Sequence, residues 1–193
     1  MPGQSIHFAV AHEYMPGGDG LFYFGNIAPD YIDVRAVKDI IHLRVAPDRP
    51  GALTALRGTL EPGNLFELGW LLHLFADMCW DNTAYADFAA RHGGEDGWFE
   101  NYRGELGKLS RTLFGTLPWI PGVRAKIESE ELDDTRALTK VLPVPLELGW
   151  YRDHVFRRHL RPRENDAPVE LTVEYAERFA AETAEKFRVW YGS

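Results

Sequence analysis

The fold is decided by the stretch Asn64-Leu65-Phe66-Glu67-Leu68-Gly69-Trp70-Leu71-Leu72-His73-Leu74-Phe75-Ala76-Asp77-Met78-Cys79-Trp80-Asp81. Asn64 at its start and Glu67 three residues later have the spacing of a capping box, which predicts a helix with Asn64 as its N-cap. The remaining residues are apolar on nearly every side, as is typical of a helix buried in a protein core. We therefore expect a central buried helix over about residues 64–81.

Three residues of this helix, His73, Asp77 and Asp81, are polar. Positions four apart lie on adjoining turns of one helix face, so the three side chains form a polar stripe. A buried carboxylate without compensation destabilises a protein by several kcal/mol, so each needs a cation or several hydrogen-bond donors. The rest of the chain must supply these partners.

The overall composition is that of an ordinary soluble globular protein, with 45% apolar and 26% charged residues in 193. This length is most simply one domain with a real core. The net charge of −8 argues against broad electrostatic binding of nucleic acid, but not against an enzyme that acts on a phosphate ester with a bound metal. The single cysteine, Cys79, excludes an internal disulfide, and its place in the buried helix favours a packing role.

No targeting or membrane segment is expected. The start of the chain, Met-Pro-Gly-Gln-Ser, lacks the basic and apolar regions of a signal peptide. The longest apolar run is the central helix, which Glu67, His73 and Asp77 interrupt, so it is not expected to span a membrane. A cytoplasmic location is the resulting expectation.

Other segments also have helical patterns, bounded by glycine and proline breaks. Ser5 is expected to cap the first of them, whereas residues 52–63 are expected to be an irregular connector. No repeat or convincing strand pair is present, so the predicted fold is all-α, a single-domain multi-helix bundle of residues 1–193. The further expected helices cover residues 6–15, 83–91, 97–114, 123–142 and 169–190.

Several histidines and aspartates precede or lie in the central helix. Taken singly, each has an ordinary explanation: a satisfied core histidine, or a Pro-Asp turn at Asp30. Taken together, they offer the imidazole nitrogens and carboxylate oxygens that divalent transition metals bind. Helical bundles build core metal sites from such side chains, and mixed ligands with room for water suit a hydrolytic site. The set is Asp30, His42, His73 and Asp77.

Two further histidine groups leave alternatives open. His12 lies about 140° around the helix from His7, so the two are not expected to share a site, and His7 is the preferred inward residue. His154 and His159 lie among arginines, in a stretch that is either a solvated face or a substrate-facing surface. Other chemistries are weaker, because the chain has no Gly-Xaa-Ser-Xaa-Gly elbow and no Walker loop.

Over about residues 5–81 the chain resembles the zinc-dependent phospholipase C family, whose superfamily also contains zinc-dependent nucleases. The resemblance lies in an early histidine, a small-residue stretch that ends in Pro-Asp, a histidine about a dozen residues later, and a Gly-aromatic-Xaa-Xaa-His-Xaa-Xaa-Xaa-Asp helix. In this chain these are His7, Phe24-Gly25-Asn26-Ile27-Ala28-Pro29-Asp30, His42 and Gly69-Trp70-Leu71-Leu72-His73-Leu74-Phe75-Ala76-Asp77.

The resemblance implies that Asp30, His42, His73 and Asp77 hold one zinc ion. Asp77 would bridge to a second metal that His7 also binds, and Asp30 is the candidate general base. The implied activity is hydrolysis of a phosphodiester or phosphomonoester, with a lipid headgroup or a small molecule as substrate, by a metal-activated water. The cofactor is expected to be one or two zinc ions, and other divalent transition metals remain compatible with these ligands.

The chain also departs from the family pattern. It lacks the processed N-terminal Trp ligand of the secreted enzymes, and neither His154 nor His159 has a Glu four residues on, so a third zinc is not expected. Asp81 occupies the nearby position and is a candidate ligand without an assured place, alternatively a helix cap or a solvent-facing residue. A non-catalytic helical protein with a structural metal site or polar network is the main alternative, and a lipid-surface module is a weaker one because of the negative charge.

Overall fold

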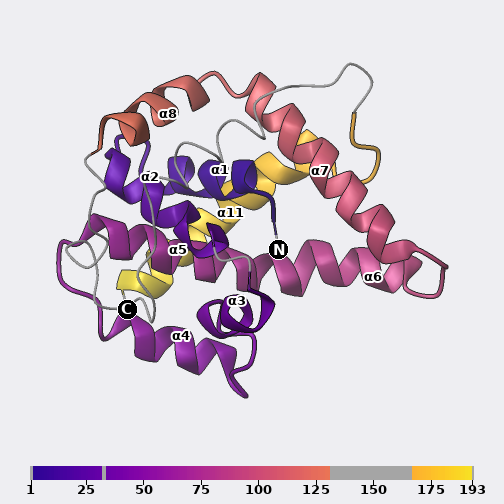
Figure 1. Ribbon diagram of the computed structural model, residues 1–193, viewed down its shortest axis with the longest axis horizontal. Helices are drawn as coiled ribbons and strands as arrows, with labels where there is room; N and C mark the ends of the chain where they lie inside the picture. The colour runs from indigo at the N-terminus through magenta and orange to yellow at the C-terminus, as the bar shows by residue number, and fades with distance from the viewer. Residues whose placement is uncertain (1, 32–33, 131–166, 193) are drawn as a thin grey trace.

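The computed structural model describes residues 2–31, 34–130 and 167–192, and within these ranges the chain is helical with no strand (Figure 1). This confirms the predicted all-α, multi-helix architecture. The elements, in chain order, are α1 (Gln4–Tyr14), α2 (Gly20–Ile27), the 3-10 helix η1 (Ala28–Tyr31), α3 (Arg35–Ile41), α4 (Arg49–Arg57), α5 (Leu65–Trp80), the π-helix η2 (Asp81–Tyr85), α6 (Ala86–His92), α7 (Trp98–Thr116), α8 (Ile120–Ser129) and α11 (Val173–Gly192).

Helix α5 is the predicted central helix, and it crosses the middle of the molecule with α1, α2, α4 and α11 packed around it (Figure 1). Its start follows the capping prediction, since the side chain of Asn64 accepts a hydrogen bond of 3.1 Å from the Glu67 N–H. The Glu67 carboxylate accepts a second one, of 2.7 Å, from the Glu61 N–H. Most apolar residues of α5 are buried as expected, from Phe66 near its start to Trp80 at its end.

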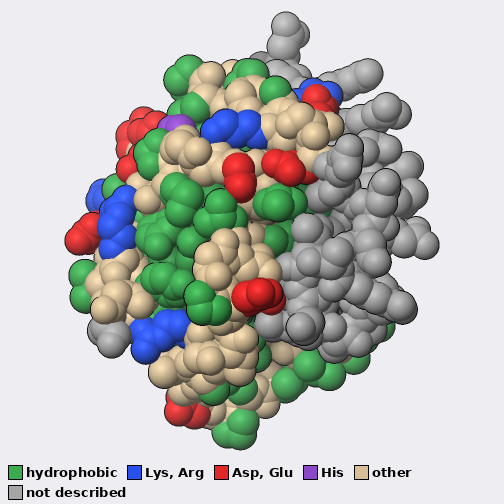
Figure 2. All heavy atoms as spheres, turned by 90° about the vertical axis from the view of Figure 1, so that its left-hand side faces the viewer, with side chains coloured by type: hydrophobic (Ala, Val, Ile, Leu, Met, Phe, Trp, Pro, Cys, Tyr) green, Lys and Arg blue, Asp and Glu red, His purple; other side chains and the backbone are tan. Residues whose placement is uncertain are grey.

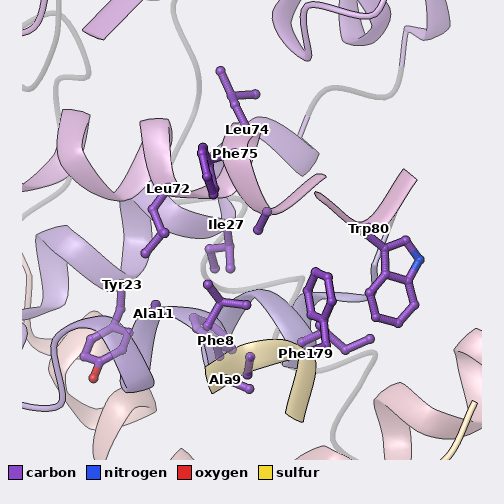
Figure 3. Close-up of a cluster of buried hydrophobic side chains, with 14 of the residues drawn as sticks. Phe8, Ala9, Ala11, Tyr23, Ile27, Leu72, Leu74, Phe75, Trp80 and Phe179 are labelled. Carbon is purple, nitrogen blue, oxygen red and sulfur yellow. The ribbon is translucent and has the colours of Figure 1, made fainter. Parts of the chain in front are cut away.

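The hydrophobic core joins helices that are distant in the sequence. Figure 3 shows Phe8 of α1, Ile27 of α2, Leu72 of α5 and Phe179 of α11 within one buried cluster. At the edge of this cluster, the buried indole N–H of Trp80 donates a 2.7 Å hydrogen bond to the hydroxyl of Tyr102 in α7. These contacts hold α5 in a fixed position between the first and last helices.

Helices α2 and α5 approach each other unusually closely, because each presents a glycine to the other's backbone. A Cβ atom on Gly25 would lie 2.0 Å from the Phe66 carbonyl oxygen, and one on Gly69 would lie 2.1 Å from the Phe22 carbonyl oxygen. No other residue type allows so close an approach of two backbones. The end of α2 is therefore brought directly against the middle of α5, where His73 lies.

The expectation of an irregular connector over residues 52–63 is wrong for its first half, because α4 covers Arg49–Arg57. The Pro47-Asp48-Arg49-Pro50-Gly51 stretch starts a helix. The Asp48 side chain accepts from the Gly51 N–H at 3.0 Å, and Pro50 lies in the first turn, where its missing N–H has no effect on the helix ladder.

Two predicted helix boundaries also differ. Helix α1 begins at Gln4 with Gly3 as N-cap, and the Ser5 hydroxyl, expected as the cap, donates to Ser110 of α7 at 2.9 Å. The chain does not break after Asp81, because η2 continues α5 directly into α6. With no glycine or proline between residues 81 and 92, nothing in this stretch ends a helix.

The remaining predicted elements are partly outside the described residues. Helix α7 matches the expected 97–114 and α11 the expected 169–190, each shifted by a few residues. Of the expected helix 123–142, only the part within α8 is described, and residues 146–160 with His154 and His159 lie outside the described ranges. None of the described helices is long and apolar enough to cross a membrane. The cytoplasmic location stays a prediction.

The visible surface mixes charge signs. Figure 2 shows hydrophobic side chains gathered near the centre of one face, with acidic and basic side chains scattered around them. Among its described residues, this face carries no broad patch of a single charge sign.

The segment that leads into α11 is fixed by charged side chains. The Glu105 carboxylate accepts from the N–H groups of Val169 and Glu170, at 2.6 and 2.8 Å. His92, at the end of α6, contacts Glu170 at 2.8 Å and Glu95 at 3.0 Å, and Arg91 also pairs with Glu170. The hydrogen bond to Glu170, followed by that to Glu95, raises the pKa of His92 above its ordinary value of 6.5.

This raised pKa predicts a pH-dependent contribution to stability. The protonated imidazole is favoured in the folded state, so its contribution is fully present below pH 6.5 and is lost as the pH rises through the higher folded pKa. The difference in melting temperature between the wild type and His92→Gln should therefore be larger at about pH 6 than at about pH 9. Burial lowers the pKa of His12, so His12→Gln should show the opposite trend. Equal differences at both pH values for His92→Gln would contradict the assignment.

Candidate metal centre

Five of the six predicted ligands come together at one place between α1, η1, α3 and α5. His7 lies on α1, Asp30 on η1, His42 directly after α3, and His73 and Asp77 on α5. The side chains of His7, His42, His73 and Asp77 are fully buried, and that of Asp30 is 11% exposed. These five residues are called the His/Asp cluster below.

The tautomers of two histidines follow from their backbone partners. Nδ1 of His73 lies 2.7 Å from the Asn26 carbonyl oxygen, and Nδ1 of His42 lies 2.7 Å from the Lys38 carbonyl oxygen. A carbonyl oxygen only accepts, so each Nδ1 must carry the proton that it donates. In the neutral imidazoles, Nε2 is then the unprotonated atom. This arrangement of a backbone-bonded Nδ1 and a free Nε2 is the one that orients histidine as a metal ligand.

The Nε2 atoms of His42 and His73 lie 3.2 Å apart, so that two lone pairs face each other when both rings are neutral. Two lone pairs at this separation repel each other unless a cation or a proton lies between them. Two ligands of a tetrahedral ion, with metal–nitrogen distances of ~2.0–2.1 Å, are about 3.3–3.4 Å apart. Oδ2 of Asp77 completes the group at 3.6 Å from His42 Nε2 and 4.0 Å from His73 Nε2. The donor atoms and their spacing therefore fit a divalent ion.

His7 and Asp30 form an overlapping second group with His73. The His7 ring stacks on the His73 ring with centroids 3.7 Å apart, and neither nitrogen of His7 has a hydrogen-bond partner among the described residues. Nε2 of His7 lies 3.5 Å from Oδ1 of Asp77, whereas His42 faces the other carboxylate oxygen, Oδ2. Asp77 thus directs one oxygen to each group, as a bridging carboxylate would. A buried imidazole without a partner is costly unless a ligand satisfies it.

The buried carboxylates also have cationic partners, which the sequence analysis did not find. The Lys38 ammonium lies 2.8 Å from Oδ1 of Asp30. Arg44 donates to Oδ2 of Asp77 at 3.0 Å. Between His42 and Arg44 the chain turns at Leu43, whose φ of 56° is rare for a residue with a branched side chain. That turn brings His42 and Arg44 to the same side of α5.

The electrostatics of the cluster favour ionised carboxylates at Asp30 and Asp77 and a neutral imidazole at His73. Burial acts to raise the pKa of Asp77, but the neighbouring His7 and His73 favour its carboxylate and the net shift is downward. The pKa of Asp30 is also lowered, because His42, His73 and Lys38 outweigh the effect of burial. Burial, and then the nearby His7, hold the pKa of His73 well below 6.5. These are the protonation states in which both residue types bind metals.

Asp81, the sixth predicted ligand, lies outside both groups of potential ligands found among the described residues. It is 25% exposed and pairs with Arg49 at 2.8 Å, with the Nε of Arg44 at 3.8 Å. His12 is also separate from the cluster, as expected, since its ring stacks on Trp119 and its Nδ1 lies 3.3 Å from the Tyr23 hydroxyl. Cys79 packs against the core, and burial raises the pKa of its thiol to about 11, which fits the expected packing role.

The missed cations had a signal in the sequence. A buried carboxylate needs a positive charge, and Lys38, Arg44 and Arg49 flank His42 within one short segment. The spacing of Lys38 and His42, four residues apart, places the lysine on the same side as the histidine. The arginines gave no such signal, because their approach to α5 depends on the turn at Leu43 and on the start of α4.

Comparison of the chain with protein-family models, with curated proteins and with solved structures finds no significant match in any of the three. The geometry of the cluster and the sequence resemblance to the phospholipase C family are therefore the basis for proposing a function.

Proposed function

We propose that this protein is a metal-dependent hydrolase of a phosphoester, with zinc as the expected ion. The observation that carries the proposal is the pair of facing Nε2 atoms of His42 and His73, 3.2 Å apart and flanked by Oδ2 of Asp77. Support also comes from the unpartnered imidazole of His7 and from the two oxygens of Asp77, which face two different groups of ligands. The residues are those that the phospholipase C resemblance implies, although the resemblance places Asp30 with the first ion and the geometry groups it with His7.

The chain's own residues have separable roles in this proposal. His42, His73 and Asp77 would hold a first ion, and His7 with Asp30 a second. A bound ion would supply Lewis acidity and lower the pKa of a coordinated water. The carbonyl groups of Asn26 and Lys38 orient the imidazoles through Nδ1. Asp30, the candidate general base, is partly exposed and ionised, although its lowered pKa makes it a weaker base than an ordinary aspartate.

A second candidate is a non-catalytic protein in which the cluster is a buried polar network. The specific observation in its favour is that Lys38 and Arg44 already neutralise Asp30 and Asp77. In this alternative, a proton shared between His42 and His73 would take the place of the ion. The protein would then be stabilised by the network and would turn over no phosphoester.

The two candidates differ in whether a chelator removes a bound metal and a phosphoesterase activity. The full chain is assayed against p-nitrophenyl phosphate and bis-p-nitrophenyl phosphate, before and after removal of metal, with zinc, manganese, iron and nickel added back. For the hydrolase, hydrolysis and about one or two bound ions per chain are lost together and restored by one of these metals. No bound metal, together with unchanged activity after chelation, would exclude a metal-dependent mechanism. No hydrolysis with any of them would favour the polar network.

A further inference from the structure

We propose that Arg44 and Arg49 bind the phosphate group of a monoester dianion at the edge of the His/Asp cluster. The inference deepens the proposed function and rests on it, since the anion would be the reacting group of the substrate. The two arginines reach this place from different elements. Arg44 follows the turn at Leu43, and Arg49 is the first residue of α4.

Both guanidinium groups lie around the same two carboxylates of α5. Arg44 is 3.0 Å from Oδ2 of Asp77 and 3.8 Å from Oδ2 of Asp81, and Arg49 is 4.0 and 2.8 Å from the same two atoms. The arginine side chains are 18% and 16% exposed, whereas Asp77 is fully buried. The arginines therefore lie on the solvent side of the cluster, between the potential ligands and the surface.

Arg49 has unused donors. Its Nε and Nη2 are buried and have no hydrogen-bond partner among the described residues, and its Nη2 remains 4.0 Å from the nearest ion-pair oxygen of Asp77. A buried guanidinium N–H without an acceptor is unfavourable, and an oxyanion is the acceptor that fits its planar fork. The Nε and Nη2 groups of Arg49 therefore indicate an anion that accepts hydrogen bonds from them.

The charge balance indicates the same ligand. In the ion pairs around the cluster, the carboxylates of Asp30, Asp39, Asp77 and Asp81 are matched by Lys38, Arg35, Arg44 and Arg49. A divalent ion held by neutral imidazoles and Asp77 would add an excess of positive charge. It would also weaken the attraction of Asp77 for Arg44. A dianion between the ion and the two arginines would restore the balance.

The number of oxygens favours a monoester over a diester. A phosphate monoester has three non-bridging oxygens, one for an ion and one for each arginine, whereas a diester has only two. Charge-assisted hydrogen bonds from two arginines also match the greater charge of the monoester dianion. The expected substrates are therefore compounds with a terminal phosphate group.

Inorganic phosphate tests the inference without any reaction. We would titrate it by calorimetry into the zinc-loaded full chain at about pH 8, where it is a dianion. Arg49→Met, Arg49→Lys and the control Arg124→Met, which alters an exposed ion pair on α8, are measured in parallel. We expect the affinity for phosphate to fall about 10- to 100-fold in Arg49→Met, to fall less in Arg49→Lys, and to stay unchanged in the control. Melting temperature and metal content establish that each variant is folded and loaded.

The outcomes separate this inference from the proposed function. Wild-type protein that binds no phosphate, or an Arg49→Met variant that binds it as the wild type does, would overturn the role of the arginines even if phosphoesters are hydrolysed. Arginine-dependent phosphate binding without any hydrolysis would support the anion site and contradict the reaction. If phosphate binding depends on Arg49 and phosphoesters are hydrolysed, Arg49→Met should raise the KM for a monoester more than the KM for a diester.

Discussion

Replacing His73 by Gln is expected to remove most of the bound metal and to lower phosphoester hydrolysis by a factor of about 1,000 or more. His73 is common to both groups of potential ligands, so its loss affects either site. Its Nε2 faces His42 Nε2, and its Nδ1 is fixed by the Asn26 carbonyl. A glutamine of similar length keeps the core filled but cannot present an imidazole nitrogen at that point. Metal analysis and initial rates on the same preparation check this prediction.

The matched control is His12→Gln, since His12 lies on the same helix as His7 but stacks on Trp119 outside the cluster. This variant should keep the metal and the rate of the wild type within a factor of about two, because it changes no potential ligand. A His73→Gln protein with full metal content and undiminished hydrolysis would contradict the assignment of the cluster as a metal centre.

The second large effect concerns stability. Gly69→Ala is expected to lower the free energy of unfolding by about 2–4 kcal/mol, because the new methyl group would lie 2.1 Å from the Phe22 carbonyl oxygen. Backbone cannot move aside as a flexible side chain can, so α2 and α5 would have to separate. The hydrogen bonds that cross this contact, from Asn26 Nδ2 to the Gly69 carbonyl and from His73 Nδ1 to the Asn26 carbonyl, would lengthen. Urea unfolding followed by circular dichroism measures the effect.

Gly104→Ala provides the comparison. Gly104 lies in the interior of α7, and a Cβ there would meet nothing within 4 Å. Alanine should therefore stabilise α7 by about 0.5–1 kcal/mol, in line with its helix propensity. If Gly69→Ala were as stable as Gly104→Ala, the close approach of α2 and α5 would not be a real constraint.

The sequence was sufficient for the central features of the fold. The apolar run with its Asn64 cap predicted α5, and the spacing of His73 and Asp77 predicted two polar residues on one buried face. These predictions succeed because they depend on local periodicity alone. The meeting of His7 and Asp30 with that face depends on contacts between helices, and it followed from the family resemblance rather than from spacing.

The positions of Arg44, Arg49 and Asp81 could not be predicted from local sequence patterns, for physical reasons. Proline and glycine directly after Arg49 are residues typical of a loop, although Asp48 caps a helix there. Arg44 approaches Asp77 only because Leu43 takes a left-handed backbone conformation, which no sequence pattern indicates for leucine. Asp81 continued the polar stripe in sequence, yet the π-helix begins at that residue and it pairs with Arg49.

The proposed function requires a divalent metal ion in the His/Asp cluster. The most direct measurement is a crystal structure of the zinc-loaded protein with anomalous data collected on both sides of the zinc absorption edge. We expect an anomalous peak for an ion coordinated by Nε2 of His42, Nε2 of His73 and an oxygen of Asp77. The distances should be about 2.0–2.2 Å, and at least one further coordination position should be open. Absence of any peak there, with Arg44 still on Asp77 and the two imidazoles sharing a hydrogen bond, would contradict it.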